Sequence, residues 1–187
     1  YFEKLYEMMT EIAESKKDFS SPFTEKRDVK KRLFIVIAGD RGLAGGYNSN
    51  LFKKAAAEME GKPAVILPIG KKTVEYFSRK GYEILSTKFA VVENIDLSDC
   101  FDIGAVLAEA FRKGEFDELY VVYTKFLNML TQEPKAVKVL PISYDMSLVD
   151  DQTSKSLIVY EPSSEEVFDT IVPQYVAGLV YGAVAES

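Results

Sequence analysis

The chain opens on an apolar stripe with the spacing of a helix that pairs with another helix. Four apolar residues recur at intervals of three, four and three positions: Phe2, Leu5, Met9 and Ile12. The residues between them are mostly charged, which leaves the opposite face of the helix for water. This spacing is typical of a coiled-coil seam, so residues 1–17 are predicted to form one helix of such a pair.

A different pattern begins at Leu33, where consecutive apolar residues run to Ala38. The run is rich in β-branched side chains and too short for a helix, which predicts a central strand covered on both faces. Glycines follow at positions 39, 42, 45 and 46, and either Asn48 or Ser49 is expected to cap a helix that extends to Met59. Strand, glycine-rich turn and helix together indicate the start of an α/β unit.

Two further units of the same kind follow. Residues 63–69 are predicted to form a buried strand that ends or bulges at Pro68, because proline cannot donate to a β-ladder. A short helix at 71–80 stops at Gly81 and leads into a weaker strand at 82–89. The next helix is predicted to start at Asp96 or Ser98, to end at Gly114 and to turn five residues inward: Phe101, Ala105, Leu107, Ala108 and Phe111.

The chain is then predicted to change direction. Strands at 119–125 and 136–140 are separated by too few residues for a helical crossover, so they are expected to pair antiparallel. Residues 143–156 are polar and lack periodicity, which predicts a loop, and residues 157–160 predict a last short strand. Ser163 and Glu166 form a capping-box pattern, which places the start of a C-terminal helix at residue 163.

The C-terminal helix, residues 163–187, is apolar on nearly all sides and is therefore expected to be covered by both the sheet and the first helix. Its glycines are expected to let a neighbouring backbone approach, and Pro173 is expected to kink the helix or loosen a turn. The uncharged stretch at 170–185 is shorter than the roughly 20 residues that span a bilayer, which predicts a buried helix rather than a membrane span. The residues predicted to pair the two helices are Leu5, Met9, Ile12, Ile171, Gly178 and Gly182.

These elements predict an α/β fold, with a Rossmann-like, mostly parallel sheet, helices on both faces and one antiparallel strand pair. The sheet domain is expected to span residues 30–162. It is flanked by the two helices at 1–17 and 163–187, which are expected to form the base of an antiparallel coiled coil.

Composition narrows the chemistry. The chain has 187 residues, of which 47% are hydrophobic and 28% charged, as in an ordinary globular domain. A net charge of −6 gives no basic field for nucleic acid. With no histidine and a single cysteine, Cys100, the sequence holds no internal disulfide, no His-based metal site and no Ser-His or Cys-His nucleophile pair. No catalytic, cofactor-binding or metal-binding residue is predicted.

The glycine-rich segments do not match known nucleotide fingerprints. A dinucleotide site requires G-x-G-x-x-G and an acidic residue after the second strand, and residues 39–46 and 67–69 supply neither. The segment beginning Gly70-Lys71-Lys72 lacks both the earlier glycine and the adjacent hydroxyl residue of a phosphate loop. The glycines of residues 42–46 are therefore expected to serve sterically, by allowing a sharp turn and close packing of the helix.

The segment at residues 39–51, GDRGLAGGYNSNL, nonetheless resembles the signature of the gamma subunit of rotary ATP synthases. A second stretch, L-I-V-Y-E-P at residues 157–162, is similar to the segment that opens the long C-terminal helix of that family. Asp40 and Arg41 are adjacent opposite charges in this turn, and such residues are more often a solvated cap and a surface group than a functional pair. The resemblance implies instead that this loop contacts a partner, through the residues Asp40, Arg41, Gly42, Leu43, Gly45, Gly46 and Asn48.

The resemblance also implies a function. In the family, a helical shaft turns within a hexamer of alpha and beta subunits, while the α/β domain rests on the membrane c-ring and holds the epsilon subunit. Such a protein is a non-catalytic central-stalk rotor of a proton-translocating ATP synthase, peripheral on the cytoplasmic face of a bacterial plasma membrane. From residue patterns alone, the competing interpretation is a small doubly wound enzyme or nucleotide-binding domain.

Overall fold

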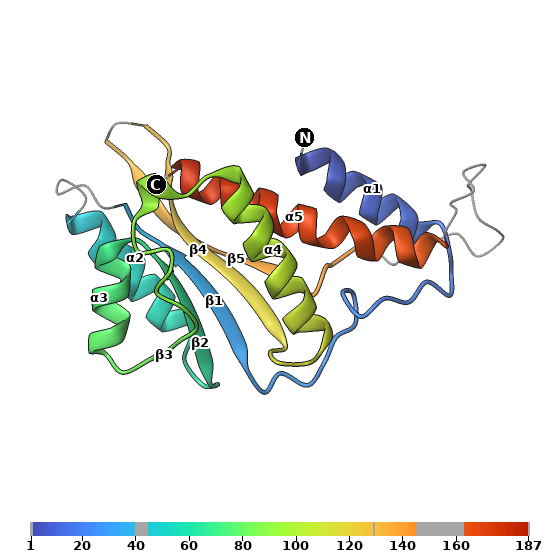
Figure 1. Ribbon diagram of the computed structural model, residues 1–187, viewed down its shortest axis with the longest axis horizontal. Helices are drawn as coiled ribbons and strands as arrows, with labels where there is room; N and C mark the ends of the chain where they lie inside the picture. The colour runs from blue at the N-terminus through green and yellow to red at the C-terminus, as the bar shows by residue number, and fades with distance from the viewer. Residues whose placement is uncertain (1, 40–44, 129, 145–162, 187) are drawn as a thin grey trace.

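The computed structural model describes residues 2–39, 45–128, 130–144 and 163–186 of the chain. Its centre is a five-stranded mixed sheet in the order β3-β2-β1-β4-β5 (Figure 1). β1 (Arg32–Ile37) lies in the middle and pairs in parallel with β2 (Ala64–Ile69) and β4 (Glu118–Phe126). β3 (Glu83–Ile84) pairs in parallel with β2, whereas β5 (Gln132–Leu140) pairs antiparallel with β4. The predicted mostly parallel sheet with one antiparallel pair is confirmed.

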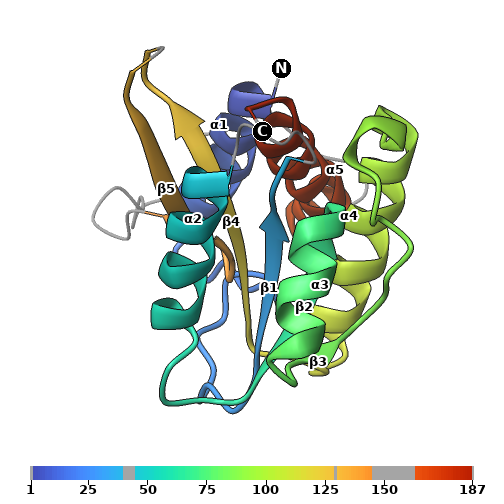
Figure 2. The same cartoon turned by 90° about the vertical axis from the view of Figure 1, so that its left-hand side faces the viewer.

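Helices cover both faces of this sheet. α2 (Gly45–Glu58) and α3 (Lys71–Arg79) pack on one face, and Figure 2 shows α2 on the opposite side of the strands from α4 (Leu97–Arg112). α4 shares the second face with α1 (Phe2–Glu14) and α5 (Ser164–Glu186).

The side chains of β1 divide between the two layers. Phe34 and Val36 belong to the core beneath α2 and α3, whereas Leu33, Ile35 and Ile37 belong to the core beneath α1, α4 and α5. Successive side chains of a strand point to opposite faces, and here both faces are covered. This explains why residues 33–38 form an unbroken apolar run.

β2 continues through Pro68 to its end without a break, so the predicted ending or bulge at this proline is wrong. The carbonyl oxygen of Ile66 accepts a hydrogen bond from the N–H of Leu85, which shows that even-numbered residues of β2 turn their backbone groups toward β3. The backbone nitrogen of Pro68 therefore points toward β3, which has already ended at that level, so no ladder hydrogen bond is lost. β3 is two residues long rather than the predicted 82–89.

Two helix ends differ from the sequence prediction. α2 already begins at Gly45, so Asn48 lies at the end of its first turn and Ser49 at the start of its second, and neither is the predicted cap. α1 ends at Glu14 rather than near residue 17. The Ser15 hydroxyl donates to the carbonyl oxygen of Ile12 at 2.7 Å, a local bond that competes with continuation of the helix.

α4 begins at the predicted position. The backbone N–H of Asp99 donates to the Asp96 carboxylate at 2.9 Å, and the Asp96 N–H donates back to the Asp99 carboxylate at 3.1 Å. Phe101 and Ala105, however, are exposed rather than turned inward. The buried face of the helix runs through residues 100, 103–104, 107–108 and 111, and with 3.6 residues per turn Phe101 and Ala105 lie to one side of it.

α5 begins as predicted, with the N–H of Glu166 donating to the Ser163 hydroxyl at 3.3 Å. At 23 residues it is also the one described helix that is long and apolar enough, by length and composition, to cross a membrane, because it extends beyond the uncharged stretch at 170–185 on both sides. Its buried side chains nevertheless belong to the protein core, and it contacts α1, α4 and β4. The strand predicted at 157–160 and most of the loop predicted at 143–156 lie outside the described residues.

Candidate functional site: the paired terminal helices

The first and last helices pack against each other in opposite directions. The Lys16 ammonium lies 2.8 Å from the Glu165 carboxylate, just after the end of α1 and at the start of α5. The rings of Tyr6 and Tyr175 lie 5.6 Å apart. Glu3 lies beside a groove that is also lined by the last turns of α5. Residues of falling number in α1 thus meet residues of rising number in α5, which is an antiparallel pair (Figure 1).

The predicted pairing residues are mostly buried. Leu5, Met9 and Ile12 are 6%, 0% and 1% exposed and belong to the same core cluster as Ile171. Gly178 is buried as well. Gly182 differs, because it is exposed and no heavy atom lies within 4 Å of the position its β-carbon would occupy. The expectation that Gly182 admits a neighbouring backbone is wrong.

The close backbone approach to α5 occurs at Gly104 of α4, which the sequence prediction missed. A β-carbon at this position would overlap the carbonyl oxygen of Pro173 and would lie 3.0 Å from the nitrogen of Ala177. A sequence signal was available, since Cys100, Gly104 and Ala108 form a row of small residues at intervals of four.

Two polar contacts join the first turns of α5 to the segment that follows α1. The hydrogen bond from Lys16 holds the pKa of the Glu165 carboxyl below its ordinary value. The Ser21 hydroxyl donates to the Asp169 carboxylate at 2.6 Å. Burial raises the pKa of Asp169, and the bond from Ser21 only partly offsets that rise.

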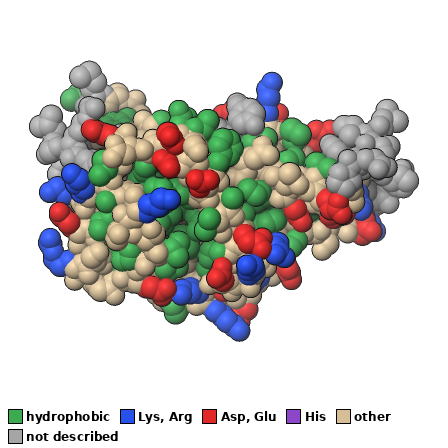
Figure 3. Space-filling model, in the orientation of Figure 1, with side chains coloured by type: hydrophobic (Ala, Val, Ile, Leu, Met, Phe, Trp, Pro, Cys, Tyr) green, Lys and Arg blue, Asp and Glu red, His purple; other side chains and the backbone are tan. Residues whose placement is uncertain are grey.

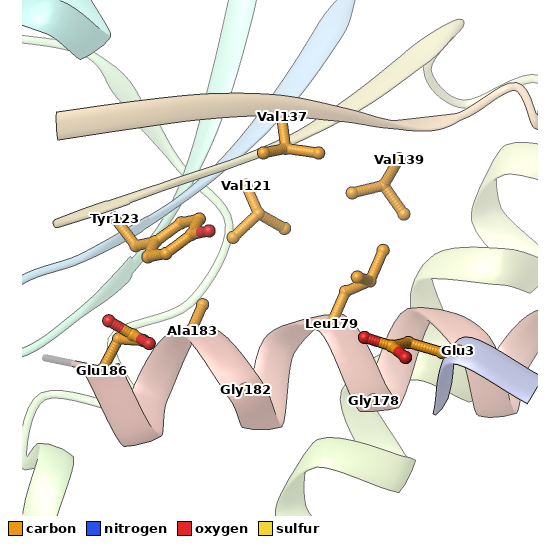
Figure 4. Close-up of a pocket in the computed structure, with 10 residues that line it drawn as sticks. All are labelled: Glu3, Val121, Tyr123, Val137, Val139, Gly178, Leu179, Gly182, Ala183 and Glu186. Carbon is orange, nitrogen blue, oxygen red and sulfur yellow. The ribbon is translucent and has the colours of Figure 1, made fainter. Parts of the chain in front are cut away.

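An apolar groove of about 550 Å³ lies between α5, β4 and β5 (Figure 4). Val121, Val137, Val139 and Leu179 supply apolar side chains to it, and Glu3 and Glu186 lie at its two ends. The carboxylate of Glu186 accepts a hydrogen bond from the backbone N–H of Phe126 at 3.2 Å, which ties the last turn of α5 to the end of β4.

The motif loop after β1 is only partly described. Asp40, Arg41, Gly42 and Leu43 lie outside the described residues, and Gly45 and Gly46 form the first residues of α2. Asn48 is 9% exposed, and its amide nitrogen lies 3.4 Å from the carbonyl oxygen of Gly39. Its side chain therefore links the first turn of α2 to the end of β1.

Neighbouring backbone occupies the space that a side chain at Gly70 would need. Gly70 has φ = 105°, and a β-carbon there would overlap the carbonyl oxygen of Ala38. The glycine is thus required for packing β2 against β1.

Burial raises the pKa of the Cys100 thiol to about 11, so this cysteine stays protonated near neutral pH. The described residues include no group of His, Cys, Asp and Glu suited to hold a metal ion.

Acidic and basic side chains are interspersed on the face shown in Figure 3, with apolar surface between them. This view shows no continuous basic patch of the kind that nucleic acid binding requires.

The fold and the helix pair together define an α/β domain joined to two antiparallel helices. The family model described as ATP synthase matches residues 1–187, the whole chain. Curated relatives that match the whole chain are named ATP synthase gamma chain. The chain therefore belongs to the ATP synthase gamma family, and the resemblance carried by residues 39–51 is confirmed at the level of the family.

The chain is 39% identical over 192 residues to the ATP synthase gamma chain of Ruminococcus albus, and it covers 66% of that relative. It is 31% identical over 204 residues to the sodium ion specific ATP synthase gamma chain of Acetobacterium woodii, of which it covers 68%. The chain thus spans about two thirds of the length of these relatives, and 66% in the case of the first.

A solved structure of the Tetrahymena thermophila mitochondrial ATP synthase central stalk and c-ring holds a chain of the same fold, with a TM-score of 0.63 at 19% identity. The match covers 99% of this chain and 78% of that one. The rotor of the Euglena gracilis mitochondrial ATP synthase gives a TM-score of 0.57 at 14% identity, covering 95% and 68%. At these identities the likeness concerns the fold.

Proposed function

We propose that this chain is the α/β domain and the adjoining helices of a central-stalk rotor subunit in a bacterial ATP synthase. The subunit is non-catalytic and couples rotation of the membrane ring to ATP synthesis or hydrolysis in partner subunits. The observation that carries the proposal is the antiparallel packing of α1 on α5, the first and last described helices, in a chain whose relatives are gamma chains. That packing supports a coiled-coil shaft with a Rossmann-like domain at its base.

The proposed partners follow from the same assignment. The paired helices lead toward a hexamer of alpha and beta subunits, and the α/β domain contacts the epsilon subunit and the c-ring. The motif residues 40–48 are proposed to contribute a partner contact. The solved structure of similar fold from Tetrahymena thermophila is that of a central stalk with a c-ring, which supports the ring as a neighbour.

The proposed location is the cytoplasmic face of the bacterial plasma membrane, where the subunit is peripheral. The gamma chains that match the whole chain at 39% and 37% identity come from bacteria. Protons are proposed as the coupling ion. The alternative is sodium coupling, but the sodium ion specific relative is less similar, at 31% identity. Measuring which ion the assembled complex pumps distinguishes the two.

The nucleotide-binding interpretation loses support from the steric role of Gly70. A phosphate loop uses its glycines to bring backbone N–H groups to a ligand, whereas Gly70 brings its backbone to the carbonyl oxygen of Ala38. Its own N–H already donates to the carbonyl oxygen of Phe89 at 3.0 Å.

Co-assembly tests the proposal. The matching segment of the Ruminococcus albus gamma chain is replaced by this chain and expressed with the alpha, beta and epsilon subunits of that organism. Native mass spectrometry should find one chimeric gamma and one epsilon per hexamer. A chimera that folds, as judged by circular dichroism, but leaves the hexamer without a gamma subunit would contradict the proposal.

A further inference from the structure

α5 has a gap in its own hydrogen-bond ladder near its middle. Pro173 lies inside the helix and has no N–H, so it cannot donate to the carbonyl of Asp169 four residues earlier. Within the helical pattern, the backbone of Pro173 is held only through its carbonyl oxygen, whose partner is the N–H of Ala177. A helix with such a gap bends more readily at that turn.

Gly104 of α4 lies against that remaining bond. A β-carbon on Gly104 would overlap the Pro173 carbonyl oxygen and would lie 3.0 Å from the Ala177 nitrogen, so the backbone of α4 touches both members of the bond. Ala177 is fully buried, and so is Cys100 one turn before Gly104. A hydrogen bond shielded from water in this way is stronger than an exposed one. The two helices are in contact here, as the crossing in Figure 1 illustrates.

The part of α5 before the proline is held by other residues. The Asp169 carboxylate accepts a hydrogen bond from Ser21, and Glu165 pairs with Lys16. Both partners belong to the segment that follows α1. The chain therefore supports α5 on one side of the gap through this segment and at the gap itself through α4.

We propose that α4 acts as a splint across the proline turn of α5, with Gly104 as the positioning residue that lets the two backbones touch. The splint makes α5 behave as one rigid rod in spite of its missing bond. The usefulness of that rigidity for transmitting torque rests on the proposed rotor function. The splint itself does not, and it is testable in the isolated chain.

Amide hydrogen exchange, followed by NMR on the 187-residue chain, measures the opening of this turn. The quantity of interest is the exchange rate of the Ala177 amide relative to that of Ile35 in the central strand, which corrects for global unfolding. Gly104→Ala should raise this ratio by about tenfold or more, because the added β-carbon separates the helices. Gly182→Ala is the matched control, since it adds the same methyl group where nothing lies within 4 Å, and it should leave the ratio unchanged.

Pro173→Ala separates a splint from ordinary packing. It restores the missing donor to Asp169, so in the Gly104→Ala background it should return the ratio to near its original value. In the native background it should change the ratio by less than about threefold, because α4 already holds the turn. The splint is refuted if Gly104→Ala leaves the ratio unchanged, or if Pro173→Ala fails to reverse its effect.

If the Gly104→Ala variant does not fold, the Pro173→Ala variant alone tests the splint. A marked slowing of amide exchange at Ala177 in that variant would show that α4 had not held this turn, and would refute the splint. None of these results depends on assembly with other subunits. A failed splint and a failed rotor function are therefore distinguishable.

Discussion

Two adjacent methionines give a sharp test of the helix pair, because they differ in burial and not in chemistry. Met9 is 0% exposed in the core between α1 and the sheet layer, whereas Met8 is 42% exposed on the outer face of the same helix. Replacing either with alanine has the same small effect on helix propensity, since both residues favour helices. The difference between the two variants therefore measures burial.

Met9→Ala is expected to lower the free energy of unfolding by about 2–5 kcal/mol, the range found when a buried Leu, Ile or Met side chain is truncated and leaves a cavity. Met8→Ala should change it by less than about 0.5 kcal/mol, as is usual for a surface position. For a chain of this size, the first change corresponds to a fall in melting temperature of about 4–20 °C.

Urea unfolding followed by circular dichroism at the helical band measures both variants. The slopes of the transitions should agree within error, so that the midpoints can be compared directly. Equal effects of the two substitutions would refute the packing of α1 described above. A large effect of Met8→Ala alone would place the opposite face of α1 against the core.

Three further predictions concern single contacts. Gly70→Ala should destabilise the chain by at least about 2 kcal/mol more than Gly61→Ala in thermal unfolding. Both glycines have positive φ, but only at Gly70 would an added β-carbon meet a backbone carbonyl, so equal effects would contradict this steric role. Arg32→Ala should lower the free energy of unfolding in urea by about 1–3 kcal/mol. The Arg32 guanidinium donates to the carbonyl oxygens of Glu58 at 2.8 Å and Glu60 at 3.0 Å, at the end of α2. Lys53 is exposed, so Lys53→Ala serves as a control that should be near neutral. Burial raises the pKa of Asp169, so its contribution to stability is fully present below its ordinary pKa of 3.8 and is lost as the pH rises through the folded value. Asp169→Asn should therefore gain stability relative to the native chain as the pH rises above 3.8, and a difference in the free energy of unfolding that stays constant with pH would contradict the assignment.

The pattern of apolar residues was sufficient to predict most of the fold. The unbroken run at 33–38 predicts a strand covered on both faces, and the structure places helices on both sides of it. The antiparallel pairing of β4 and β5 follows from the short connection between them. Local signals also fixed the starts of α4 and α5, because a capping residue specifies a helix start within one turn.

The errors arise where the outcome depends on a distant neighbour. Pro68 stays inside β2 because β3 ends early, which no local pattern near Pro68 reveals. Gly182 and Gly104 are both small helical residues, but only Gly104 faces another helix, and helix crossings are set by tertiary packing. The motif at residues 39–51 identifies the family, whereas the contacts of Asp40 to Leu43 stay a prediction.

The central claim, that this chain turns as part of a rotor, is tested most directly by observing rotation. The chimeric gamma chain described above is assembled with its partner subunits, and a bead is attached through Ser78→Cys on the exposed side of α3. Cys100 is buried with a raised thiol pKa, so it should not compete with the new cysteine for the label. The account predicts that ATP drives the bead in one direction in steps of a third of a turn, matching the three-fold hexamer. A fully assembled complex that hydrolyses ATP while the bead stays still would contradict it.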